Sequence, residues 1–164
     1  MKKQKNAVSK KTEKILMRML DYIEKEPKRL DMNTWGEIYS KGAEVDENEQ
    51  ELPPCKTVAC LAGTCLLVTR AGLDFLRESY VTKEHANSYH EGNIDFPSHT
   101  PDKAEEILGI TDAQAKNLFY FADWRSDGYG WPMKFVEQYN KAKTARGRFQ
   151  VTKRRVLHFI KTGE

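Results

Sequence analysis

Three cysteines spaced five residues apart, Cys55, Cys60 and Cys65, are the first residues in this sequence whose types could do chemistry. A thiol in the first turn of a helix has a lowered pKa, and Cys60 would lie there. Five residues turn a helix by about 500°, so Cys60 and Cys65 lie about 140° apart and share no face. We interpret the cysteines as small buried hydrophobes, assign no catalytic residue, and rank a cysteine-dependent enzyme as the least favoured function.

Three histidines with acidic neighbours form the second candidate set. The spacing of His85, His90 and His99 matches no ligand pattern on a helix face or a hairpin, and no Cys-x2-Cys pair accompanies them. A nucleophilic cysteine would need a base nearby, and the sequence does not show whether one of these histidines lies there. We predict that they are surface loop residues, and we predict no metal and no cofactor.

A loop rimmed with aromatic residues is a candidate ligand site. Its sequence, Asp-Gly-Tyr-Gly at residues 127–130, is typical of a turn, and Arg125 precedes it. Stacking and charge together would hold a small nucleotide-like ligand there. Packing in the core explains the aromatic residues equally well. The ligand-binding hypothesis names Trp124, Arg125, Tyr129 and Trp131.

The last predicted helix, residues 145–162, is a candidate surface for an acidic partner. If Phe149 is set at 0°, Val156 and Ile160 fall within about 20° of it and form an apolar stripe. The basic residues spread over the opposite half, at about 120° to 260°. Such a helix places one face on the core and offers the other to phosphates or to an acidic protein. The partner-binding hypothesis names Arg148, Arg154, Arg155, His158 and Lys161.

The net charge of +3 hides an uneven distribution. Residues 1–30 carry 10 Lys and Arg against 4 Asp and Glu, residues 31–133 carry 8 against 18, and residues 134–164 carry 9 against 2. Two basic ends therefore flank an acidic middle. Either the ends offer a basic surface to an acidic partner, or they pack against the acidic middle and are neutralised by it.

The elements that would position these residues are mostly helices. Apolar spacing and capping signals predict helices that begin near Thr12, Thr57, Thr100, Thr111, Trp131 and Ala145. The second, over residues 57–71, is apolar on every side and is predicted to be buried, with Gly63 at the close approach of a neighbouring helix. Residues 80–82 and 94–96 are candidate strands of a hairpin. The predicted fold class is mainly α, a single-domain bundle of five to six helices around a buried central helix, with one small β-hairpin as an optional addition.

The first ten residues are rich in lysine and have almost no apolar anchor. We therefore predict a flexible basic tail over residues 1–10 and a single helical domain over residues 11–164. No apolar run approaches the roughly 20 residues that span a bilayer, and no apolar region follows the charged start as in a signal peptide. The cysteines are odd in number and closely spaced, unlike those of small secreted proteins. The sequence predicts a cytoplasmic protein without a membrane segment.

Two segments resemble known sequences. Residues 55–63 read Cys-Lys-Thr-Val-Ala-Cys-Leu-Ala-Gly, a Cys-x4-Cys-x-Ala-Gly pattern. Residues 108–119, followed by Trp131-Pro132, match Leu-Gly-[Leu/Ile]-Thr-x2-Gln-Ala-x2-Leu-Phe … Trp-Pro. Residues 53–163 thus resemble a group of small uncharacterised bacterial and phage proteins, although Lys56 replaces the Gly that commonly follows their first Cys. The resemblance implies a shared fold but no chemistry, and a phage- or defence-associated setting is part of the functional prediction.

The leading functional prediction is a non-catalytic binding or regulatory protein that engages an acidic partner, either a nucleic acid or an acidic protein surface. The two basic ends and the lack of a recognisable catalytic constellation favour it. One alternative is the capture of a small nucleotide-like ligand, and the other is a cysteine-dependent enzyme. The sequence predicts no oligomeric state.

Overall fold

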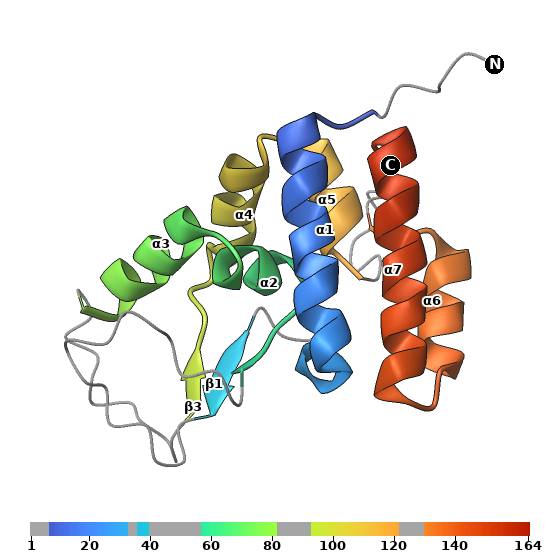
Figure 1. The fold of residues 1–164 in the computed structure, drawn as a ribbon, viewed down its shortest axis with the longest axis horizontal. Coiled ribbons are helices and arrows are strands. Elements are labelled where there is room, and N and C mark those ends of the chain that lie inside the picture. Colours follow the sequence, from blue (N-terminus) through green and yellow to red (C-terminus); the bar gives the residue numbers. More distant parts are fainter. Residues whose placement is uncertain (1–6, 33–35, 40–56, 82–92, 122–129) are drawn as a thin grey trace.

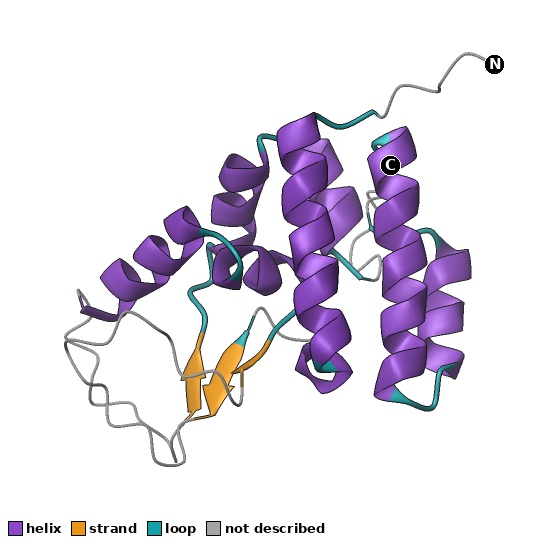
Figure 2. Cartoon of the chain, in the orientation of Figure 1, coloured by secondary structure: helices purple, strands orange, loops and turns teal. Residues whose placement is uncertain are grey.

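The structure, a computed structural model, describes residues 7–32, 36–39, 57–81, 93–121 and 130–164. The predicted mainly α-helical class is confirmed (Figures 1 and 2). In chain order the elements are α1 (Lys10–Lys25), the 3-10 helix η1 (Pro27–Arg29), β1 (Glu37–Tyr39), β2 (Thr57–Val58), α2 (Leu61–Leu67), α3 (Arg70–Val81), β3 (Asn93–Asp95), α4 (Thr100–Leu108), α5 (Asp112–Phe119), α6 (Met133–Lys141) and α7 (Ala145–Thr162).

The central element is the short helix α2, in which every residue from Leu61 to Leu66 is buried. It contacts α1, α3, α4 and α5, so it lies inside the bundle as expected. The expected helix over residues 57–71 is wrong at both ends, because Thr57–Val58 is a strand and the chain turns at Val68 and Thr69. The Thr69 hydroxyl explains the break. It donates to the Cys65 carbonyl at 2.9 Å and accepts from the Gly72 N–H at 3.3 Å, as a residue capping a new helix does.

A close backbone approach occurs at Gly72, in the first turn of α3. A Cβ atom built on Gly72 would overlap the backbone of Leu66, the residue that lies near the end of α2. Glycine is therefore required for α3 to fold back on α2 this tightly. Gly63, where the sequence predicts the close approach, is buried within α2.

Three short strands form an antiparallel sheet in the order β2-β1-β3. Ile38 of β1 pairs with Thr57 on one side and with Ile94 on the other. The strand expected at residues 80–82 is wrong for Tyr80 and Val81, which belong to α3, and Thr82 lies outside the described residues. The strand expected at residues 94–96 is confirmed in part by β3, whose partner is β1. Hydrophobic alternation alone cannot distinguish a short strand from the last turn of a helix.

Capping signals placed the helices in the C-terminal half well. Gly109 ends α4 in the left-handed conformation with φ of 62°, and Thr111 and Gln114 form the predicted capping box of α5. At α1 the N-cap is Ser9, not Thr12. The Thr12 side chain is buried, and its hydroxyl donates to the Leu108 carbonyl at 2.8 Å, so it joins α1 to the end of α4.

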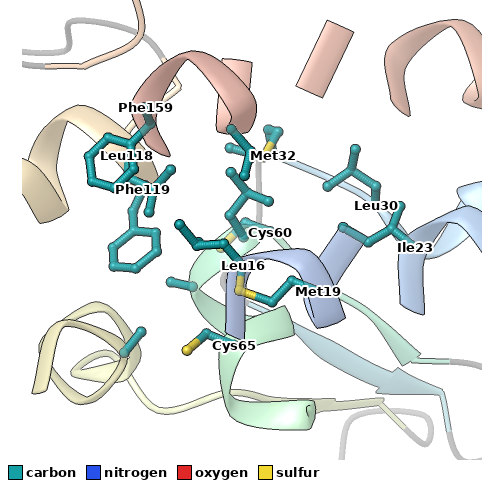
Figure 3. Close-up of a cluster of buried hydrophobic side chains, with 14 of the residues drawn as sticks. Leu16, Met19, Ile23, Leu30, Met32, Cys60, Cys65, Leu118, Phe119 and Phe159 are labelled. Atoms are coloured by element: carbon teal, nitrogen blue, oxygen red, sulfur yellow. The ribbon is translucent and has the colours of Figure 1, made fainter. Parts of the chain in front are cut away.

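Helix α7 lies between α1 and α6 and contacts both (Figure 1). The N–H of Ala7 donates to the Ile160 carbonyl at 3.1 Å, which holds residues ahead of α1 against the end of α7. Of the predicted tail, residues 1–6 lie outside the described residues. The hydrophobic core contains Leu16 and Met19 of α1, Cys60 before α2, Leu118 of α5 and Phe159 of α7 (Figure 3). None of the described helices has both the length and the apolar character needed to span a bilayer.

We predict that Gly72→Ala destabilises the protein by about 1–3 kcal/mol or more, because the new methyl group overlaps the Leu66 backbone. Helix propensity alone predicts a gain of roughly 1 kcal/mol from the same change, so the sign of the effect is diagnostic. Urea unfolding followed by circular dichroism measures it. Ala71→Leu, one position away and exposed, is the control and should be nearly neutral. A Gly72→Ala variant as stable as the parent would contradict the close approach.

Candidate functional site

The buried side of α7 is much wider than its sequence stripe indicates. With Phe149 at 0°, Val151 lies at about 200° and Phe159 at about 280°, and both are buried. The burial follows from the packing of α7 against two helices, α1 on one side and α6 on the other. Arg155 lies at about 240°, between Val151 and Phe159, and has an exposed fraction of 0%. The expectation that Arg155 belongs to the outer basic face is therefore wrong.

The Arg155 guanidinium is held by main-chain oxygens. Nη2 donates to the Asn117 carbonyl at 2.7 Å, and Nη1 donates to the main-chain oxygen of Glu164 at 2.6 Å. The rings of Phe135 and Phe159 both lie 5.9 Å from the guanidinium carbon, within range of a cation–π contact. Burial lowers the pKa of Arg155 to about 10, so the group keeps its positive charge at neutral pH. Arg155 thus joins α7 to the last turn of α5 and to the segment after α7.

The remaining candidates on α7 divide between two sides of the helix. Arg154 and Lys161 are exposed, and His158 is half-buried at their edge. Arg148 lies elsewhere, because its Nη1 donates to the Ala142 carbonyl at 3.4 Å and its side chain lines a polar hollow of about 440 Å³ beside Tyr139. Three of the five predicted partner-binding residues, Arg154, His158 and Lys161, therefore share one face.

Helix α6 adds cations to this face that the sequence stripe of α7 does not reveal. Arg154 Nη2 donates to Gln138 Oε1 at 2.8 Å across the seam between α6 and α7. Lys134 and Lys141 lie on the same side of α6 as Gln138, since they are four residues before and three residues after it. Two features of the sequence could have predicted these lysines: the short connection between the two helices, and the i−4, i, i+3 spacing of the polar residues on α6. We call Lys134, Arg154 and Lys161, with His158 at their edge, the α6–α7 basic face.

The pKa of His158 is lowered both by burial and by the charges around it. It lies below the ordinary value of a histidine because of partial burial first, and then because of the positive charges of Arg155, Lys134 and Lys161, which Glu164 opposes. The His158 ring also lies 5.9 Å from the ring of Phe135 on α6. Cations from both helices therefore converge on one point of the surface.

Among the described residues, no ion pair joins these cations to the acidic middle of the chain. The described residues form six ion pairs with one another. Five of those six pairs lie within a single helix, such as Lys141 with Glu137 at 3.7 Å. The sixth joins Lys153 of α7 to Glu24 of α1 at 3.3 Å, so it links the two basic ends to each other. None involves Lys134, Arg154 or Lys161.

The predicted small-ligand site is largely outside the described residues, which exclude Trp124, Arg125 and Tyr129. Trp131 is described, and it is a core residue with an exposed fraction of 3%. Its indole Nε1 donates to the Leu118 carbonyl at 2.9 Å, and its ring makes edge contacts with Phe121 and Tyr139. The structure thus places Trp131 in the core, with its ring covered and its indole donor used within the protein.

The two described cysteines are buried, as predicted. Burial raises the pKa of Cys60 to about 11, although the N–H groups of Gly63 and Ala62 act in the opposite direction. Burial also raises the pKa of Cys65, to about 12. Neither thiol is ionised to a useful extent at neutral pH, which argues against a nucleophilic role for either. Cys55 lies outside the described residues.

The candidate metal residues are dispersed in the part of the chain that the structure describes. His85 and His90 lie outside it. His99 precedes α4, and its ring packs edge-on against Phe75 at 5.0 Å. No group of three or more His, Cys, Asp and Glu side chains among the described residues is placed to hold a metal ion.

Comparisons with known proteins do not extend this picture. No family model, curated protein or solved structure matches the chain. The resemblance to small bacterial and phage proteins stays a prediction, and a function has to be inferred from the geometry of the described residues.

We predict that Arg155→Met costs about 3–5 kcal/mol of stability, because two main-chain oxygens lose a charged donor inside the protein. Arg154→Met, one residue away but exposed, should change stability by less than about 1 kcal/mol. Urea unfolding of both variants measures the difference. Equal stability of the two variants would show that Arg155 is a surface residue.

We also predict slow labelling of Cys60 and Cys65 by a disulfide reagent in the native protein, at least about a hundredfold slower than in urea. A Cys55→Ser background lets the two be read alone. Because both pKa values are raised above the roughly 8.5 of an unfolded thiol, stability should fall as the pH rises from there towards 11. Fast native labelling of either thiol would overturn its assignment to the core.

Proposed function

We propose that this protein is a non-catalytic cytoplasmic binding protein that holds a polyanion, the phosphate backbone of a nucleic acid, on the α6–α7 basic face. One observation carries the proposal. Lys134, Arg154 and Lys161 are exposed on one side of a helical hairpin, and none forms an ion pair with a described carboxylate. Phosphate groups bind such uncompensated cations and release condensed counterions in doing so.

The geometry of the face supports a regular polyanion. Arg154 and Lys161 are seven residues apart on α7, a rise of about 10.5 Å along the helix, and Lys134 lies beside them on α6. The bond from Arg154 to Gln138 fixes that guanidinium and leaves further N–H donors on it for an oxygen of the partner. The uncompensated cations therefore come from two neighbouring helices and extend over about two turns of α7.

The composition of the face favours phosphates over an acidic protein. Protein interfaces centre on buried aromatic or aliphatic anchors, whereas interfaces with nucleic acids are more polar and more positively charged. The α6–α7 basic face consists mainly of basic residues around Gln138 and His158, and Leu157, which lies between Arg154 and Lys161 on α7, is the one leucine of the two helices. Binding of this kind positions the backbone and reads no sequence.

We predict that the triple variant Lys134→Glu, Arg154→Glu, Lys161→Glu loses at least tenfold in affinity for a mixed-sequence duplex DNA or single-stranded RNA. The slope of log affinity against log salt should become shallower by about 0.7–0.9 for each phosphate that the variant no longer neutralises. Fluorescence anisotropy at several salt concentrations measures both. Stability should change by less than about 1 kcal/mol, because the side chains are exposed.

The control is Lys10→Glu, Lys11→Glu, Lys14→Glu, which changes three exposed cations of α1 and alters the net charge equally. It should keep most of the affinity. In wild type, binding should raise the pKa of His158, measured by NMR titration, because phosphates offset Lys134 and Lys161. Equal losses in both variants, an unchanged His158 pKa, or equally tight binding of polyglutamate would each contradict the proposal.

A further inference from the structure

A groove of about 600 Å³ opens on a different surface, between α1 and the turn that joins α2 to α3. Its floor combines the half-buried apolar side chains of Leu67 and Val68, from the end of α2, and Leu73, from the start of α3, with the buried Thr69. The ring of Tyr22 on α1 completes the floor and is covered on one side by the Arg29 guanidinium at 4.8 Å.

The rim of this groove is mainly positive. Arg18 and Lys25 are exposed on α1, and Arg70 is exposed at the start of α3. Asp21 is the one carboxylate among the described residues that line the groove. Neither Arg18 nor Lys25 forms an ion pair with a described residue. Arg70 lies 3.9 Å from Asp74, and its side chain is 94% exposed.

We infer that this groove binds an acidic amphipathic segment of a protein partner. An amphipathic helix places its apolar side chains in such a groove, at positions i, i+3, i+4 and i+7. Arg18 and Lys25 are separated by about 10.5 Å along α1, so the groove spans about two turns of a bound helix. Carboxylates on the flanks of that helix would meet Arg18, Lys25 and Arg70.

The apolar floor is what distinguishes this partner from a nucleic acid. A phosphate backbone gains nothing from Leu67, Val68 and Leu73, whereas an acidic segment with leucines uses both the floor and the rim. On the α6–α7 basic face a single leucine, Leu157, lies among the cations, whereas three apolar side chains line the groove together. The two surfaces therefore fit two partners of different chemistry, and this inference does not depend on the proposed function.

The test uses a fluorescein-labelled peptide of about 14 residues, four helical turns, with leucines at i, i+3, i+4 and i+7 and glutamates elsewhere. Its affinity for the full chain is measured by anisotropy at physiological salt. A second peptide has serine in place of every leucine. Two protein variants carry equal changes in charge: Arg18→Glu with Lys25→Glu in the groove, and Lys134→Glu with Lys161→Glu on the α6–α7 basic face. Each variant is also assayed with duplex DNA.

We expect the groove variant to lose at least about tenfold in peptide affinity and the α6–α7 variant to lose less than about threefold. The serine peptide should bind at least about tenfold more weakly than the leucine peptide. Equal binding of the two peptides would overturn the inference, because charge alone would then explain it. A loss of peptide binding confined to the α6–α7 variant would overturn it as well.

The DNA arm separates this inference from the proposed function. Loss of DNA binding only in the α6–α7 variant, with loss of peptide binding only in the groove variant, supports both. If the groove variant loses peptide binding while neither variant changes DNA binding, the groove assignment is supported and the proposed function is contradicted. If the groove variant loses DNA and keeps the peptide, the groove assignment fails.

Discussion

A charged side chain that lies inside the protein, Arg155, determines how the C-terminal half is assembled. Its guanidinium donates to the Asn117 carbonyl in the last turn of α5 and to the main-chain oxygen of Glu164 after α7. The end of α5 is also tied to the start of the next segment, since Trp131 N–H donates to the Tyr120 carbonyl at 3.0 Å. These bonds fix α6 and α7 relative to α5. The α6–α7 basic face exists because both helices are held in that position.

Burying Arg155 also affects the surface that lies outside it. A cation removed from water costs free energy, and the two main-chain oxygens and the rings of Phe135 and Phe159 offset part of that cost. Its charge is screened less than that of an exposed residue, so its field reaches His158 together with those of Lys134 and Lys161. The buried Arg155 and the exposed Lys134 and Lys161 therefore all add positive potential at His158.

The sequence predicted those parts of the fold that local chemistry determines. Gly109, Thr111 with Gln114, and the bounds of the last helix follow from capping and from apolar spacing, and the structure confirms them. The apolar stripe misplaces Arg155 because a narrow stripe assumes one neighbouring helix, whereas α7 packs against α1, α6 and η1, and its buried arc extends to about 200°. The break at Thr69 was missed because an apolar run does not show that a threonine hydroxyl caps a second helix.

The fold determines where the unevenly distributed charges of the chain lie on the surface. The two basic ends of the sequence become α1 and the α6–α7 hairpin, and Lys153 with Glu24 joins them side by side. Their outer surfaces nevertheless differ in what lies beneath the cations. Beside α1, the half-buried side chains of Leu67, Val68 and Leu73 line one groove, whereas on α7 most apolar side chains pack against neighbouring helices and Leu157 is exposed among the cations. Similar net charge thus produces two surfaces of different chemistry, because the packing of each helix decides how its accessible apolar side chains are arranged among the cations.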